Sequence, residues 1–86
     1  MQTVTFFGSV LEYTNGEKSF SPELCTNLQG VVDILAGRYG DPIKDSLLDG
    51  SFFPLVNGKG IMMTGGLNTP LYPDDRIEIL PFVDAG

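Results

Sequence analysis

One amphipathic stripe limits most strongly how this chain can fold. Five apolar residues recur at the spacing of a single helical face: Leu28, Val31, Val32, Leu35 and Tyr39. Thr26 is a favourable N-cap, and Gln29 three residues later would complete a capping box. Gly40 suits a left-handed C-cap, and Pro42 prevents the helix from continuing. The sequence therefore predicts one principal helix between Thr26 and Gly40.

Short strand-like segments surround this helix. Residue type and alternation predict strands at 2–7, 17–21, 52–56, 60–62 and 76–80. Asn15-Gly16 and Asn57-Gly58 are two-residue turn signals. Residues 43–48 suit a short helical turn, and Pro81 would end the last strand because it has no N–H to donate. This order predicts an α+β fold, a mixed sheet of four to five strands with one main helix packed on one face.

The length of 86 residues indicates a single domain. We expect residues 1–81 to form this domain and residues 82–86 to form a flexible C-terminal functional tail. Cys25 is the only cysteine, so a disulfide within the chain is impossible, which fits a reducing cytoplasm. The apolar runs are far shorter than the roughly 20 residues that span a bilayer, and the first residues do not resemble a signal peptide. We therefore expect a cytoplasmic protein without membrane association.

The composition excludes most catalytic chemistry. Histidine is absent, so the chain has no imidazole base, and a single cysteine cannot build a Cys-rich zinc site. Neither a P-loop nor a dinucleotide fingerprint occurs. The net charge of -6 and five scattered basic residues are unfavourable for nucleic acid. The sequence thus predicts a protein that is not an enzyme by itself and that binds no metal, cofactor or nucleic acid.

An acidic cluster and the lone cysteine are the remaining polar candidates before the C-terminus. The cluster comprises Asp74, Asp75 and Glu78, with Asp84 further along. Carboxylates in a turn favour a solvated face, and the alternative is a docking surface for a basic patch on a partner protein. Cys25 precedes the expected N-cap, where a structural cysteine is favoured over a reactive thiolate.

The C-terminus carries the most distinctive chemical group. Residues 82–86 follow Pro81 and end in Gly86, a residue without a side chain that suits passage through a narrow channel. The α-carboxylate becomes electrophilic only once it is activated, for example as an acyl-adenylate. The composition of the tail alone favours a frayed end with a chance glycine.

Residues 65–83 resemble the late segment of the MoaD/ThiS-type ubiquitin-like sulfur-carrier family. Residues 65–71 read GGLNTPL, similar to the "GGLdTPL" loop of that family. An acidic turn, an alternating strand, a proline and a valine follow in the same order. Val56-Asn57-Gly58 resembles the family's "VNG" turn, and the helix has the expected position. The resemblance covers most of the chain and favours the molybdopterin synthase small subunit over the shorter thiamine-type carriers.

This resemblance implies a β-grasp fold and a role for Gly86. An E1-like enzyme that uses ATP would adenylate Gly86, and sulfur transfer would convert it to a thiocarboxylate. The sulfur would go to a pterin precursor of the molybdenum or tungsten cofactor. The tail residues Phe82, Val83, Asp84 and Ala85 would thread into the active site of the large synthase subunit. Phe53, Leu55 and Phe82 are candidates for an apolar docking surface, although core packing is favoured for most of them.

One departure from the family leaves other functions open. The family ends in Gly-Gly, whereas this chain ends in Ala85-Gly86. The added methyl group would hinder threading through a tight channel, unless a longer form carries a further glycine. The alternatives are a ubiquitin-like modifier conjugated to lysines, a thiamine-type sulfur carrier, and an interaction module that has lost the carrier chemistry. Ala85 favours the last of these.

Overall fold

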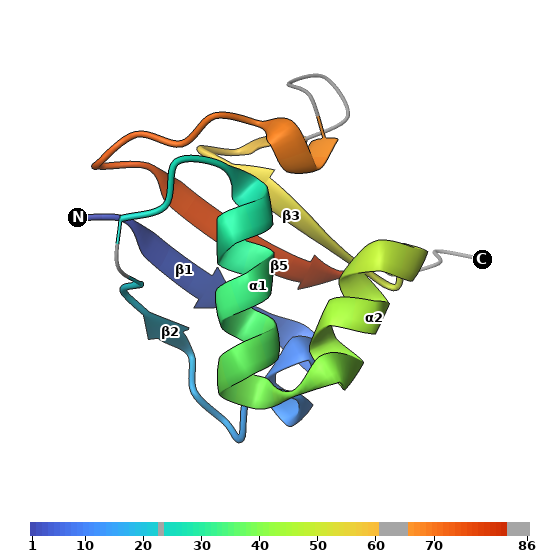
Figure 1. Ribbon diagram of the computed structural model, residues 1–86. Coiled ribbons are helices and arrows are strands. Elements are labelled where there is room, and N and C mark those ends of the chain that lie inside the picture. Colours follow the sequence, from blue (N-terminus) through green and yellow to red (C-terminus); the bar gives the residue numbers. More distant parts are fainter. Residues whose placement is uncertain (23, 61–65, 83–86) are drawn as a thin grey trace.

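The structure is a computed structural model, and it describes residues 1–22, 24–60 and 66–82. In this part of the chain five strands form one mixed sheet in the order β2-β1-β5-β3-β4. Figure 1 shows β2, β1, β5 and β3 side by side in that order. The strands are β1 (Thr3–Phe6), β2 (Ser19–Phe20), β3 (Phe52–Val56), β4 (Lys59–Gly60) and β5 (Arg76–Pro81). The central strand β5 runs parallel to its neighbour β1, and the other pairs are antiparallel. The predicted mixed sheet is therefore confirmed.

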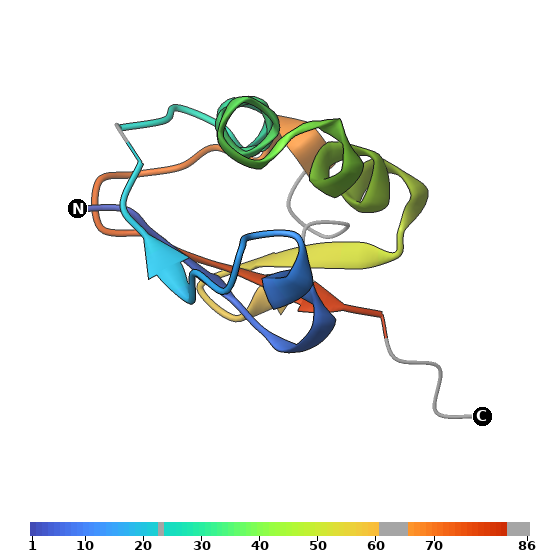
Figure 2. The ribbon, with the colours of Figure 1, turned by 90° about the horizontal axis from the view of Figure 1, so that it is seen from below.

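Two helices, α1 (Leu28–Tyr39) and α2 (Asp41–Asp49), lie on the same face of this sheet (Figure 2). The apolar stripe of α1 is buried against Val4, Phe6, Ile77 and Ile79 of the central strands. The prediction of only a short helical turn after α1 is wrong, because α2 has nine residues. Its Ile43 is fully buried, so the core stabilises a full helix there. The fold class is α+β, as predicted.

The helix α1 begins one residue later than the sequence suggests. Asn27 is the N-cap, and its side-chain oxygen accepts a hydrogen bond from the Gly30 N–H at 3.0 Å. Gln29 does not complete a capping box, since its amide donates to Asp33. The Leu71 N–H donates to the carbonyl of Thr26, which ties that residue to a distant segment. The predicted cap at Thr26 is therefore wrong, and the bond to Leu71, which is far away in the sequence, accounts for the difference.

Both Asn-Gly pairs form left-handed turns, as their sequence predicts. The φ angles are 57° and 83° at Asn15-Gly16, and 53° and 82° at Asn57-Gly58. The second turn joins β3 to β4, and the predicted residues 61 and 62 of β4 lie outside the described residues. The first hairpin differs from the expected loop, because Gly8–Glu12 form a 3-10 helix, η1, whose Val10 is buried in the core.

Pro81 belongs to β5, although the sequence suggested that it ends regular pairing. It pairs with Phe52, and the next N–H, of Phe82, donates to the carbonyl of Ser51 at 2.7 Å. Successive N–H groups point to opposite sides of a strand, so the nitrogen of Pro81 faces β1 rather than β3. On the side of β1, the last hydrogen bond runs from the Phe7 N–H to the carbonyl of Ile79, and β1 itself ends at Phe6. The missing donor of Pro81 thus costs no ladder bond.

Candidate functional site

The sheet face opposite the helices carries apolar side chains near the end of β5. Along β3, Phe52 and Val56 are buried while Phe53 and Leu55 are half-buried, so the latter two point to the uncovered face. Along β5, Leu80 alternates in the same way with the buried Ile79. Phe53 and Leu80 are direct cross-strand partners. Their side chains are therefore neighbours on this face.

Two exposed phenylalanines extend this surface. Phe7 follows the buried Phe6 in extended conformation and is 40% exposed. Phe82 lies two residues beyond Leu80 and is 67% exposed. We name the set Phe7, Phe53, Leu55, Leu80 and Phe82 the apolar patch. Exposed apolar groups gathered in one place typically mark an interaction surface.

The apolar patch includes Phe82, the first residue of the predicted tail. The N–H of Phe82 is bonded to Ser51, so the first residue of the tail is still attached to the sheet. Val83, Asp84, Ala85 and Gly86 lie outside the described residues, and their predicted roles stay predictions. Four residues, 83–86, thus follow Phe82, the last residue of the apolar patch, so any group on Gly86 is connected to the patch through them.

The preference for core packing is wrong for the apolar docking candidates. Phe53 and Leu55 are half-buried on the open face, Phe82 is exposed, and none of them belongs to the core cluster. Sequence reasoning also missed Phe7 and Leu80 as members of this surface. The alternation of Phe6 with Phe7 and of Ile79 with Leu80 was the available signal, because it places one residue of each pair outside the core.

The acidic docking candidates lie at the other end of the sheet. Asp74 and Asp75 precede β5, whereas Phe82 follows it, so roughly 20 Å of strand separates them. Asp74 accepts a hydrogen bond from the terminal amine of Met1 at 2.7 Å, and this bond lowers the pKa of the Asp74 carboxyl. The structure thus does not bring the acidic candidates together with the apolar ones.

Asp75 has a structural task at this remote end. One carboxylate oxygen accepts from the Asn57 side chain at 2.9 Å, and the other accepts from the Tyr72 N–H at 2.9 Å. The side-chain oxygen of Asn57 in turn accepts from the Arg76 N–H. These bonds connect the β3–β4 turn to the turn before β5. Both oxygens of Asp75 therefore already have partners within the chain.

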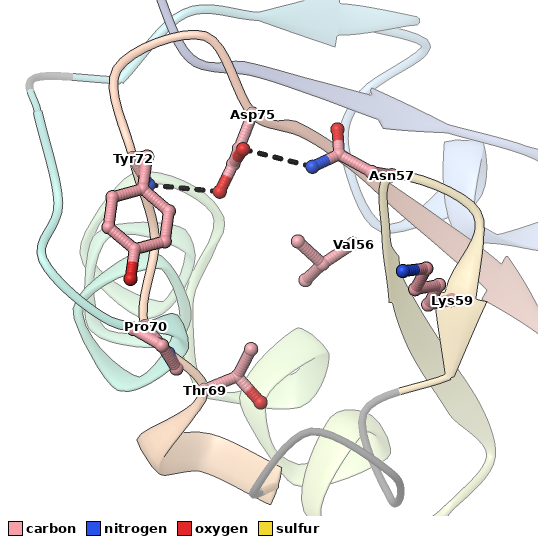
Figure 3. Close-up of a pocket in the computed structure, with 7 residues that line it drawn as sticks. All are labelled: Val56, Asn57, Lys59, Thr69, Pro70, Tyr72 and Asp75. Carbon is pink, nitrogen blue, oxygen red and sulfur yellow. Dashed lines mark hydrogen bonds between the residues drawn. The ribbon is translucent and has the colours of Figure 1, made fainter.

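A shallow pocket of about 370 Å³ lies beside Asp75. Its lining consists of Val56, Asn57, Lys59, Thr69, Pro70, Tyr72 and Asp75. Figure 3 shows the carboxylate of Asp75 turned toward Asn57 and the Tyr72 backbone. Both oxygens of the one carboxylate in this lining are therefore bonded within the chain.

The described residues contain neither a metal cluster nor a membrane span. No group of three or more His, Cys, Asp or Glu in residues 1–22, 24–60 and 66–82 could hold a metal ion. Over the same ranges, no helix has the length and apolar character needed to cross a bilayer. Cys25 is buried, as a structural cysteine would be, and its backbone N–H and carbonyl both bond to the side chain of Gln2.

Known structures share this arrangement over nearly the whole chain. CysO of Mycobacterium tuberculosis, described as an antigen, is 28% identical, with 96% of this chain and 100% of that chain covered and a TM-score of 0.82. A chain of the Amycolatopsis orientalis BexX/CysO complex is 25% identical, with full coverage of both chains and a TM-score of 0.85. Small archaeal modifier protein 1 of Methanosarcina acetivorans is 28% identical, with 99% and 95% covered and a TM-score of 0.78.

These likenesses and the sheet order define a ubiquitin-like β-grasp protein. The ThiS family model matches residues 4–86, and the chain therefore belongs to the ThiS family. The resemblance to MoaD/ThiS-type sulfur carriers is thus confirmed. No curated protein sequence is significantly similar to this chain.

Proposed function

We propose that this protein is a sulfur carrier that works through Gly86. An E1-like enzyme would join the Gly86 carboxylate to AMP from ATP with release of pyrophosphate, and a sulfur nucleophile would then displace the AMP to leave a thiocarboxylate. The observation that carries this proposal is the apolar patch at the base of the tail. A carrier needs a surface for docking and a reactive end beside it, and it needs no catalytic cluster of its own.

The more specific proposal concerns the sulfur acceptor. We propose that the sulfur goes to a pterin precursor of the molybdenum or tungsten cofactor, with this chain as the small subunit of molybdopterin synthase. The loop at residues 65–71 supports this assignment through its resemblance to that branch of the family. The large subunit would supply the active site, so this chain would be part of an enzyme only in that complex. We place both partners in the cytoplasm.

Intact mass spectrometry tests the carrier reaction. The chain is incubated with its E1-like enzyme, ATP and sulfide, and the tail peptide is then isolated. The expected product has one oxygen of Gly86 replaced by sulfur. A variant that carries one additional glycine after Gly86 is the matched control for the Ala85-Gly86 ending. If only that variant gains sulfur, the ending is incomplete, and if neither does, the carrier proposal is wrong.

A protein modifier is the second candidate function. The 28% identity to small archaeal modifier protein 1 favours it, because that protein is named as a modifier. The same activated Gly86 would then form an amide with lysine amines of other proteins. One assay distinguishes the two functions: the reaction with the E1-like enzyme and ATP is repeated with cell extract in place of sulfide. Bands that are heavier than the target by one copy of this chain and that resist reducing agents would support the modifier.

A further inference from the structure

The end of β5 is held from both sides just before the tail begins. On one side, the Phe82 N–H donates to the carbonyl of Ser51 at 2.7 Å. On the other side, Pro81 packs against Gly8 at the start of η1, where a Cβ on Gly8 would lie 3.0 Å from Cγ of Pro81. We name Gly8, Ser51, Pro81 and Phe82 the tail clamp. Contacts on both sides of a strand this close to the end of the chain are unusual, because chain ends are commonly poorly ordered.

Gly8 is the residue that makes the close approach possible. Its φ angle is +60°, a left-handed conformation in which residues with a side chain are strained. A side chain at this position would also press on the ring of Pro81. Two independent features, backbone conformation and contact distance, thus require glycine where η1 meets the strand end.

Ser51 is itself held by a second hydrogen bond. Its N–H donates to a side-chain oxygen of Asp49 at 2.7 Å, at the end of α2. The next residue, Phe52, meets the ring of Tyr13 edge-on, with the ring centroids 4.9 Å apart. Tyr13 follows η1 directly. The ring contact between Tyr13 and Phe52 therefore connects the segment that contains Gly8 to the segment that contains Ser51.

We propose that the tail clamp fixes Phe82 as the origin of the tail and so sets how far Gly86 can reach. Four residues follow Phe82, and four residues span at most roughly 14 Å. A partner that covers the apolar patch must therefore hold its reacting group within that distance of Phe82. The clamp itself rests only on the described contacts, and its consequence for chemistry rests on the proposed sulfur-carrier function.

Amide hydrogen exchange tests the clamp without any partner. The Phe82 amide is expected to exchange at least about tenfold more slowly than its intrinsic rate, because it is hydrogen-bonded in the sheet. Phe82→Ala keeps the N–H and is expected to retain protection at residue 82. Gly8→Ala is expected to remove most of this protection while the amides of β1 and α1 stay protected. A Phe82 amide that exchanges at its intrinsic rate in the original chain would overturn the proposal.

A double-mutant cycle tests what the clamp does for the reaction. Deletion of Val83 shortens the reach by one residue, or roughly 3 Å, and is expected to slow thiocarboxylate formation at least about tenfold. In a Gly8→Ala background the end of β5 can detach from the sheet, which adds length to the tail. The same deletion is therefore expected to slow the reaction less than about threefold. Equal effects of the deletion in both backgrounds would overturn the proposal.

The design separates the clamp from the carrier function. If Gly8→Ala fails to fold, Phe82→Pro replaces it in the cycle, because proline has no N–H to donate to Ser51; this variant also loses the phenyl ring and fixes φ at residue 82. Phe82→Ala is then the reference for the lost ring. If the original chain gains no sulfur, the carrier proposal fails, while hydrogen exchange at Phe82 still decides whether the clamp exists.

Discussion

The two ends of the sheet use their surface residues in opposite ways. Where β5 begins, the polar groups of Asp74, Asp75 and Asn57 are bonded to other parts of the same chain. Where β5 ends, Phe7 and Phe82 are 40% and 67% exposed, and the half-buried Leu80 pairs across the strands with Phe53. The first end thus bonds its polar groups within the chain, with Met1 and Tyr72 exposed beside them, whereas the second end exposes the phenylalanines of the apolar patch.

This difference indicates which end meets a partner. Exposed apolar surface is unfavourable in water, and covering it stabilises a complex. Carboxylates that already accept bonds within the chain gain less from a new partner, since the internal bonds would first have to break. We therefore expect partners to dock on the apolar patch, beside the tail, and we expect the remote end to serve stability.

The largest effect is expected at Gln2, which anchors the remote end. Its buried side chain donates to the carbonyls of Cys25 and Tyr72 and accepts from the Cys25 N–H. Gln2→Ala would leave these buried groups without partners, so the free energy of unfolding should fall by about 3 kcal/mol. Urea denaturation measures this loss. Gln29→Ala, at a half-buried glutamine whose side chain makes one solvent-exposed hydrogen bond to Asp33, should cost only about 0.5 kcal/mol, and equal costs would contradict the structural role of Gln2.

The next largest effect is expected in the apolar patch. Phe53→Ser should weaken binding to the E1-like enzyme by about 2 kcal/mol, or roughly 30-fold, because Phe53 lies at the centre of the proposed interface. Isothermal titration calorimetry measures this change. Tyr72→Ser is the matched control, as Tyr72 is 63% exposed at the remote end. Weaker binding by Tyr72→Ser than by Phe53→Ser would reverse the assignment of the two ends.

A smaller effect is expected at Asp75. Asp75→Asn keeps the shape of the side chain but turns one acceptor into a donor, so it loses one of the two bonds from Asn57 and Tyr72. The free energy of unfolding should fall by about 1 kcal/mol, while partner affinity should change less than about threefold. Thermal unfolding and calorimetry on the same variant measure both. A stable variant with strongly reduced affinity would restore Asp75 as a docking residue.

The smallest effect is expected for the ion pair of Asp74 with the Met1 amine. This bond lowers the pKa of the Asp74 carboxyl in the folded protein, so the pair stabilises the fold above the ordinary carboxyl pKa. Its contribution is lost as the pH falls through the lowered pKa. Asp74→Asn should therefore be slightly less stable than the original chain near neutral pH and equally stable in strong acid. A stability difference that grows on acidification would contradict this pairing.

Local sequence signals predicted the parts of the fold that depend on neighbouring residues. The strand at 52–56 was predicted with its observed bounds, since Gly50 precedes it and Asn57-Gly58 follows it. The two Asn-Gly turns were also found, because their left-handed conformation depends on residue type alone. The helix α1 was predicted from the spacing of the apolar residues in its stripe.

Features that depend on distant contacts were missed. The N-cap of α1 lies at Asn27 because Thr26 bonds to Leu71. Pro81 fits in β5 because β1 ends beside it, which no local pattern reveals. The apolar patch likewise required the register that places Phe53 beside Leu80. Residue types indicated the candidates, and only the sheet showed which of them meet at the tail.

Oxidative footprinting tests the central claim that partners dock at the tail end of the sheet. Hydroxyl radicals label exposed aromatic and methionine side chains, and both ends of the molecule carry such residues. With the E1-like enzyme bound, labelling of Phe7 and Phe82 is expected to fall severalfold, while labelling of Met1 and Tyr72 is expected to stay the same. Protection of Met1 and Tyr72 with Phe7 and Phe82 still labelled would contradict the account.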